Sequence, residues 1–176
     1  MNQKHLGTLA LAWAGIFAFR FFLLPVRAPN VEPLLASLMP VGRHASVIVS
    51  VLFAMSSIVA YDAVTAGWGS WTWAAAGTYG LIAVAAHLYF RALPATRAHF
   101  VGFGIVATLA YDAVTGLAMG PLIFGQPFVL ALAGQIPFTL LHLAGTVLFA
   151  LTVSPLLDRA LAVHPAGVPA HAPARA

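Results

Sequence analysis

Cysteine is absent from this chain of 176 residues, which excludes disulfide bonds, thiolate metal sites and thiol catalysis. Charge is also scarce: charged residues make up 7% of the chain, and only four residues are acids. The sequence contains no Walker motif, no G-x-S-x-G and no H-E-x-x-H. We therefore expect no enzymatic activity, no cofactor, no resident metal and no transport driven by ATP bound to this chain.

Apolar residues dominate what remains. They account for 61% of the chain, and the mean hydropathy is +0.94, a value that soluble domains do not reach. The excess of Lys and Arg over acids is typical of loops on one face of a membrane. The sequence contains no basic stripe of the kind that would predict nucleic-acid binding. The composition predicts an all-α, polytopic helical bundle within the lipid bilayer.

The apolar runs divide the chain into a single bundle domain, residues 1–159, and a disordered cytoplasmic tail, residues 160–176, rich in Ala, Pro and His. About six transmembrane helices are expected, including one short second helix at residues 31–41. That segment is too short for an upright span, which needs about 20 residues, and whether it crosses the membrane stays open. The long spans are expected at residues 6–25, 45–66, 71–93, 98–118 and 138–157.

Two further breaks are expected near the end of the bundle. Gly120 and Pro121 should end the span that begins at residue 98. Residues 124–135 should then form a short helix or hairpin at the membrane edge, with the last span restarting at Pro137.

The basic residues leave two orientations open. If the short segment crosses, both termini are cytoplasmic and Arg27 alone lies outside; if it does not, Lys4 is the residue left outside. Both alternatives place Asp62 and Asp112 at the outer ends of their helices. The residues on the cytoplasmic side in the first case are Lys4, Arg43, Arg91, Arg97, Arg159 and Arg175.

The pentapeptide YDAVT occurs twice, at residues 61–65 and 111–115, and holds two of the four acids. An acid at the centre of a membrane helix costs about 2.5–3.5 kcal/mol on insertion scales and is a functional candidate by default. Tyr and Thr are four residues apart and Asp and Thr three, so the polar groups share one helix face. They form either a structural lock between two duplicated halves or a site for a polar or cationic solute.

Other polar residues stand out against the apolar background. Arg20 lies one turn before the end of the first helix, where it snorkels, pairs with Glu32, Asp62 or Asp112, or clamps a substrate anion. Thr139, His142 and Thr146 share one face of the last span, just after Gln135. A histidine there is either an interhelical hydrogen-bond partner or a ligand contact.

Small residues form a stripe on the first helix at Ala10, Ala14 and Ala18. Such a stripe lets another helix approach closely, either from within the bundle or from a partner protein.

Several segments together resemble the substrate-binding (S) components of energy-coupling factor transporters, in particular uncharacterised members of that superfamily. They are FGQPF at residues 124–128, which contains Gln126, QIPFT at 135–139 with His142, and the stretch from residue 23 to MPVG at 39–42.

The resemblance implies a six-helix bundle with both termini in the cytoplasm and a vitamin, metal or related micronutrient bound in the outer half. It implies that the alanine stripe docks a transmembrane coupling subunit carried by two ATPases, in the inner (plasma) membrane of a bacterium or archaeon. The expected solute-binding residues are Arg20, Glu32, Tyr61, Asp62, Thr65, Tyr111, Asp112, Thr115, Gln126, Gln135, Thr139 and His142.

Two other functions compete with a solute-binding transporter subunit. One is a non-transporting membrane scaffold or assembly subunit, whose acids only form structural ion pairs. The other is a small intramembrane enzyme or proton-linked carrier that uses Asp62, Asp112 and His142. A cavity lined by both pentapeptides favours the transporter subunit, whereas full packing with every Asp bonded inside the protein favours the scaffold.

Overall fold

The structure, a computed structural model, describes residues 3–26 and 28–162, which contain helices and turns and no strand. Five helical stretches are long and apolar enough to cross a membrane: α1, α3, α4, the unit from α5 to α6, and α7. The prediction of an all-α membrane bundle with a short second helix is confirmed. The elements are α1 (Gln3–Phe22), α2 (Leu34–His44), α3 (Val47–Val64), α4 (Ser70–Ala92), α5 (Arg97–Asp112), the π-helical η1 (Ala113–Met119), α6 (Gly120–Phe124) and α7 (Phe128–Ala162).

The short helix α2 is the centre of the bundle. Every residue from 34 to 42 is buried, and α2 contacts α1, α3, α4, α5 and α7. Its eleven residues span only about 16 Å at 1.5 Å per residue, so it relies on these neighbours to cover it. At Gly42 an added Cβ would lie 2.9 Å from the backbone nitrogen of His87, so glycine lets α2 and α4 approach this closely.

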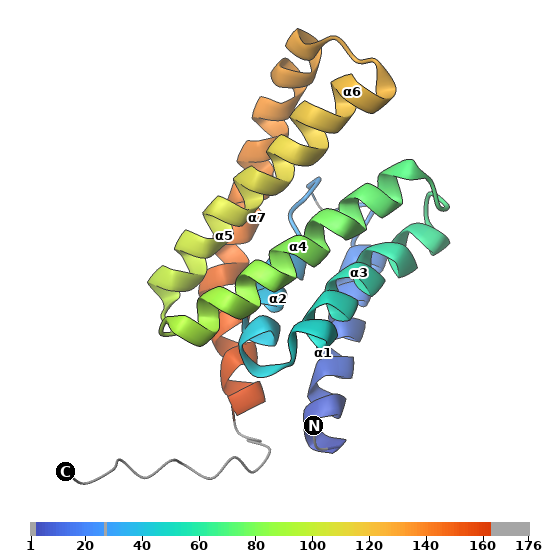
Figure 1. Cartoon of the computed structure of the whole chain (residues 1–176). Helices are drawn as coiled ribbons and strands as arrows, with labels where there is room; N and C mark the ends of the chain where they lie inside the picture. Colours follow the sequence, from blue (N-terminus) through green and yellow to red (C-terminus); the bar gives the residue numbers. More distant parts are fainter. Residues whose placement is uncertain (1–2, 27, 163–176) are drawn as a thin grey trace, which may run out of the picture.

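Two helical pairs flank α2 (Figure 1). One pair is α3 with α4, and the other is α5 with α7, while α1 packs against α3 and α7. The pairs lie close together beside α2 and diverge toward the end that carries α6 (Figure 1). Side chains at helix starts fix the entry points, because Ser46 accepts from the Val49 amide and Thr96 from the His99 amide.

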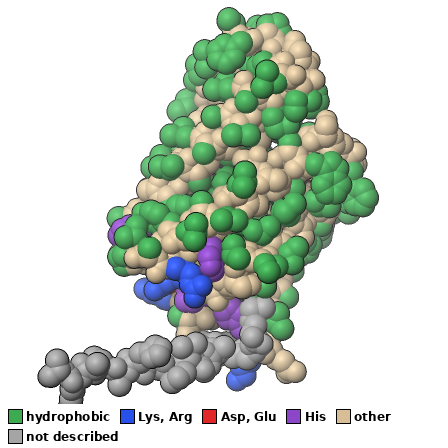
Figure 2. Space-filling model, in the orientation of Figure 1, with side chains coloured by type: hydrophobic (Ala, Val, Ile, Leu, Met, Phe, Trp, Pro, Cys, Tyr) green, Lys and Arg blue, Asp and Glu red, His purple; other side chains and the backbone are tan. Residues whose placement is uncertain are grey.

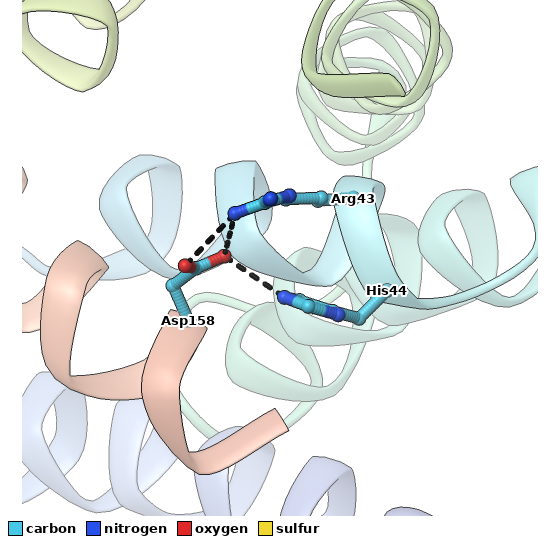
Figure 3. A network of polar contacts seen from close by, with 3 residues as sticks. All are labelled: Arg43, His44 and Asp158. Carbon is cyan, nitrogen blue, oxygen red and sulfur yellow. Dashed lines mark hydrogen bonds and ion pairs between the residues drawn. The ribbon is translucent and has the colours of Figure 1, made fainter. Parts of the chain in front are cut away.

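One end of the bundle is basic, and we call it the basic end. Arg43 and His44 at the end of α2 both reach Asp158 near the end of α7, with nitrogen–oxygen distances of 3.0 and 2.9 Å (Figure 3). His87, near the end of α4, is hydrogen-bonded to the Gly42 carbonyl at 2.9 Å. Figure 2 shows Lys, Arg and His side chains gathered at this end.

The start of α1 also lies at the basic end (Figure 1). Phe19 meets Phe149 edge-on at 5.4 Å, and Leu9 shares a core cluster with Leu161, so α1 and α7 run antiparallel. The chain therefore leaves the basic end through α1 and returns to the basic end through the following loop and α2. This is the predicted alternative in which the short segment brings the chain back across; Arg27 and Arg175 lie outside the described residues.

The two breaks expected near the end of the bundle are wrong. The helix that begins at Arg97 continues through η1 and α6 to Phe124, and α7 is unbroken through Pro137. Pro137 removes one donor, yet neighbouring helices support proline-containing helices in membranes. Pro121 lies within this continuous stretch, directly after the π-helical η1, and does not end the helix. Helix α7 ends at Ala162, three residues past the predicted bundle, and residues 163–176 of the predicted tail lie outside the described residues.

Candidate functional site

A cavity of about 260 Å³ lies between the two helical pairs, in the half of the bundle opposite the basic end. We call it the inner cavity. Its volume lies just below the range of about 300–1,000 Å³ that is usual for ligand pockets, which suits a small solute. Six of the predicted site residues line it: Arg20, Glu32, Tyr61, Asp62, Tyr111 and His142.

The two pentapeptide copies share one local geometry and then differ. In each copy the threonine hydroxyl donates to the carbonyl of its own tyrosine, at 2.8 Å in both. After the first copy the chain turns, and the Asp62 carbonyl accepts from the Gly67 amide at 2.7 Å. Within the second copy the helix passes into η1 at Ala113 and continues. The copies are thus similar in sequence and local bonding but not equivalent in the site.

Arg20 has its partners within the protein. Its Nε lies 2.7 Å from Glu32 Oε2, and both side chains are about nine-tenths buried. One terminal nitrogen donates to the Ser57 carbonyl at 3.1 Å, and the guanidinium lies over the Tyr61 ring at 4.0 Å. Of the partners that the sequence left open, Arg20 pairs with Glu32.

Asp112 and His142 form a buried pair between α5 and α7. The distance from His142 Nδ1 to Asp112 Oδ1 is 2.8 Å. If Asp112 is ionised, its carboxylate can only accept, so His142 Nδ1 donates this bond and Nε2 is the ring nitrogen left to face a ligand. The second Asp112 oxygen, Oδ2, is buried with no hydrogen-bond partner among the described residues. Asp112 itself does not line the inner cavity, so it acts there through His142.

A second cavity, of about 380 Å³, lies nearer the end that carries α6, and we call it the outer chamber. It contains the predicted residues Thr115, Gln126 and Gln135 and shares Trp71 and Phe138 with the inner cavity. These two aromatic side chains therefore stand between the chambers.

Glycines make room for both glutamines of the outer chamber. A Cβ on Gly116 would overlap the Gln135 side chain, and one on Gly120 would lie 2.9 Å from Gln126 Oε1. Gln135 also donates to Thr139 Oγ1 at 3.0 Å. Thr139 itself lines a neighbouring apolar groove beside α5, while Thr65 is exposed and lines none of the cavities described here.

Six residues of the inner cavity were missed in the sequence: Asn30, Ile58, Trp71, Ala75, Tyr79 and Phe138. Trp71 lies at the start of α4, where a tryptophan in a membrane helix is ordinarily explained as an anchor at the membrane–water interface. The Tyr79 and Tyr111 ring centroids lie 4.7 Å apart. Asn30 has the left-handed conformation at φ 61°, which asparagine tolerates, and its buried Nδ2 has no hydrogen-bond partner among the described residues.

The alanine stripe lies on the outside of the bundle at its first two positions. Ala10 and Ala14 are exposed and Ala18 is half-buried, whereas the buried face of α1 is formed by His5, Leu9, Ile16 and Arg20. Ala10 and Ala14 therefore do not contribute to packing within the bundle.

No protein-family model, curated protein or solved structure matches this chain. The resemblance to S components stays a prediction, and function is inferred from the chemistry of the site. Within the described residues no three His, Asp or Glu side chains are placed to share a metal ion.

Proposed function

We propose that the chain is the membrane-embedded, solute-binding subunit of an uptake transporter, as the resemblance to S components implies. The observation that carries the proposal is the inner cavity, which is lined by Tyr61 and Asp62 of the first pentapeptide and Tyr111 of the second. Its mixture of aromatic walls and a few polar groups is typical of small-molecule sites.

Orientation follows from the basic end. Lys and Arg prefer the cytoplasmic face, which supports an orientation in which the inner cavity opens to the outside. The membrane, as the resemblance implies, is the inner (plasma) membrane of a bacterium or archaeon. A solute such as a vitamin-like micronutrient enters through the outer chamber. The exposed Ala10 and Ala14 then offer α1 to a transmembrane coupling subunit, and two ATPases supply the energy.

A scaffold without transport activity is the second candidate, because three of the four acids are bonded within the protein. Glu32 pairs with Arg20, Asp112 with His142, and Asp158 with Arg43 and His44. Asp62 is the exception: among the described residues nothing is bonded to its carboxylate, and it faces the inner cavity. This unpaired acid favours a binding site.

A cavity-filling variant tests the proposal. Ala75 lines the inner cavity, so Ala75→Leu should fill part of it, whereas Ala85→Leu adds the same atoms to an exposed position on the same helix. Native mass spectrometry of gently purified protein should show a small molecule retained by the wild type and by Ala85→Leu. Ala75→Leu should lose it while keeping a similar melting temperature.

Two outcomes contradict the proposal. Retention of the molecule by Ala75→Leu would place its site elsewhere. Absence of any retained molecule from the wild type, together with no response of the melting temperature to added cell-extract solutes, would favour the scaffold.

A further inference from the structure

The positive charge in the inner cavity is already matched. Arg20 contacts Glu32, the Ser57 carbonyl and the Tyr61 ring, all at short distances. A solute anion would have to compete with the Glu32 carboxylate 2.7 Å away. The Arg20 guanidinium is therefore a poor receptor for an anion.

The negative charge in the cavity is not matched. Asp62 is half-buried and lines the cavity, and no described residue forms an ion pair or hydrogen bond with its carboxylate. Asp112 does not line the cavity and bonds to His142. Among the described residues that line the inner cavity, Asp62 thus provides one uncompensated negative charge beside partly apolar walls, where charges interact more strongly than in water.

The walls around this charge are aromatic. Tyr79 and Tyr111 stand 4.7 Å apart, and Tyr111 and Phe138 meet the His142 ring edge-on at 5.7 and 6.3 Å. Ring faces attract cations, as Arg20 over Tyr61 already illustrates. Two further polar groups are available beside this charge, namely Asn30 Nδ2 as a donor and His142 Nε2.

We propose that the solute is a planar organic cation with a single positive charge, held with that charge against Asp62 and its ring among the aromatic side chains. This inference depends on the proposed function, because it specifies the ligand of the same site. An organic cation suits the cavity better than a bare metal ion, since no three ligating side chains in the described part of the chain are placed to share one.

Three probes of nearly equal shape test the charge: 1-methylnicotinamide, a cation, nicotinamide, which is neutral, and nicotinate, an anion. Isothermal titration calorimetry on the purified full chain should show the cation binding at least tenfold tighter than nicotinamide, which corresponds to about 1.4 kcal/mol, with nicotinate weaker still. Asp62→Asn should reduce the preference to less than twofold, and Asp62→Glu should retain it. Asp158→Asn, at the basic end, removes a charge outside the cavity and should leave the preference unchanged.

Equal or tighter binding of nicotinamide or nicotinate, or a cation preference that survives in Asp62→Asn, would overturn the inference. If none of the probes binds, the charge of the molecule retained in native mass spectrometry decides. A positively charged molecule supports the inference, and a neutral or anionic one refutes it while leaving the proposed function standing. Absence of both retained molecule and probe binding refutes the proposed function itself.

Discussion

Replacing Gly145 by alanine probes how α7 positions the loop between α1 and α2. Gly145 is buried in α7, and a Cβ there would lie 2.9 Å from Val31 Cα and 3.3 Å from the Asn30 carbonyl oxygen. The loop residues Asn30 and Glu32 both line the inner cavity. The absence of a side chain at Gly145 therefore leaves the space in which the backbone of this loop packs against α7.

The size of the effect follows from these distances. Ordinary contact begins at 3.4 Å, so the backbone at Val31 has to withdraw by about 0.5 Å. Overpacking of this kind typically costs about 1–3 kcal/mol, and exchanging glycine for alanine within a helix returns up to about 1 kcal/mol. The net cost should be about 1 kcal/mol. At roughly 2–4 °C per kcal/mol for a chain of this length, the melting temperature in detergent should fall by a few degrees.

Binding should suffer more than stability, because the withdrawal pulls on Glu32 and on its 2.7 Å ion pair with Arg20. Native mass spectrometry should show clear loss of the retained molecule in Gly145→Ala. Gly77→Ala is the matched control, because its Cβ meets nothing within 4 Å, and it should melt at or above the wild-type temperature. A Gly145→Ala protein that melts and retains its solute like the wild type would refute this role of the glycine. An equal loss of melting temperature and of retained molecule in both variants would show that the effect comes from replacing any helix glycine, and not from the contact with the loop.

Three further predictions concern orientation, the two pentapeptides and the face of α1. A single cysteine at Ser70 should react with an impermeant thiol reagent in intact cells and one at Thr96 should not; the reverse pattern would invert the orientation. Asp112→Asn should lower both the melting temperature and solute retention, because it weakens the bond to His142, whereas Asp62→Asn should lower retention alone; equal loss of stability in both would indicate a structural lock. Ala14→Leu should leave the melting temperature unchanged, because Ala14 is exposed, and should abolish co-purification of partner chains, so that a destabilised variant would contradict the outward placement.

The sequence predicted the class of fold and much of the candidate site from two signals. Long apolar runs locate the spanning helices, because a helix in lipid must bond its own backbone. The repeated pentapeptide identified Asp62 and Asp112 as candidate site residues, because an acid within a membrane span is energetically costly and is therefore a functional candidate by default. The half of the bundle in which the cavity lies was predicted by both orientations.

What the sequence left open depends on packing between distant segments. Arg20 had three acids to choose from, and only the path of the loop brings Glu32 to it. Tyr79 and Phe138 are ordinary apolar positions in the sequence, and their role arises from how α4 and α7 face each other. The predicted break at Pro137 is wrong because the tendency of proline to break a helix was applied alone. Neighbouring helices in a membrane can support a helix that contains proline.

The burial of α2 has a consequence for how the protein is made. Ser154 of α7 donates to the Ala36 carbonyl at 2.7 Å across 118 positions of the chain, and Asp158 meets Arg43 across 115. At synthesis rates of about 5–20 residues per second, α2 is synthesised roughly 6–24 seconds before these partners. α2 is therefore fully covered only after α7, the last of the described helices, has been made. A chain that stops before α7 lacks the element that closes the bundle.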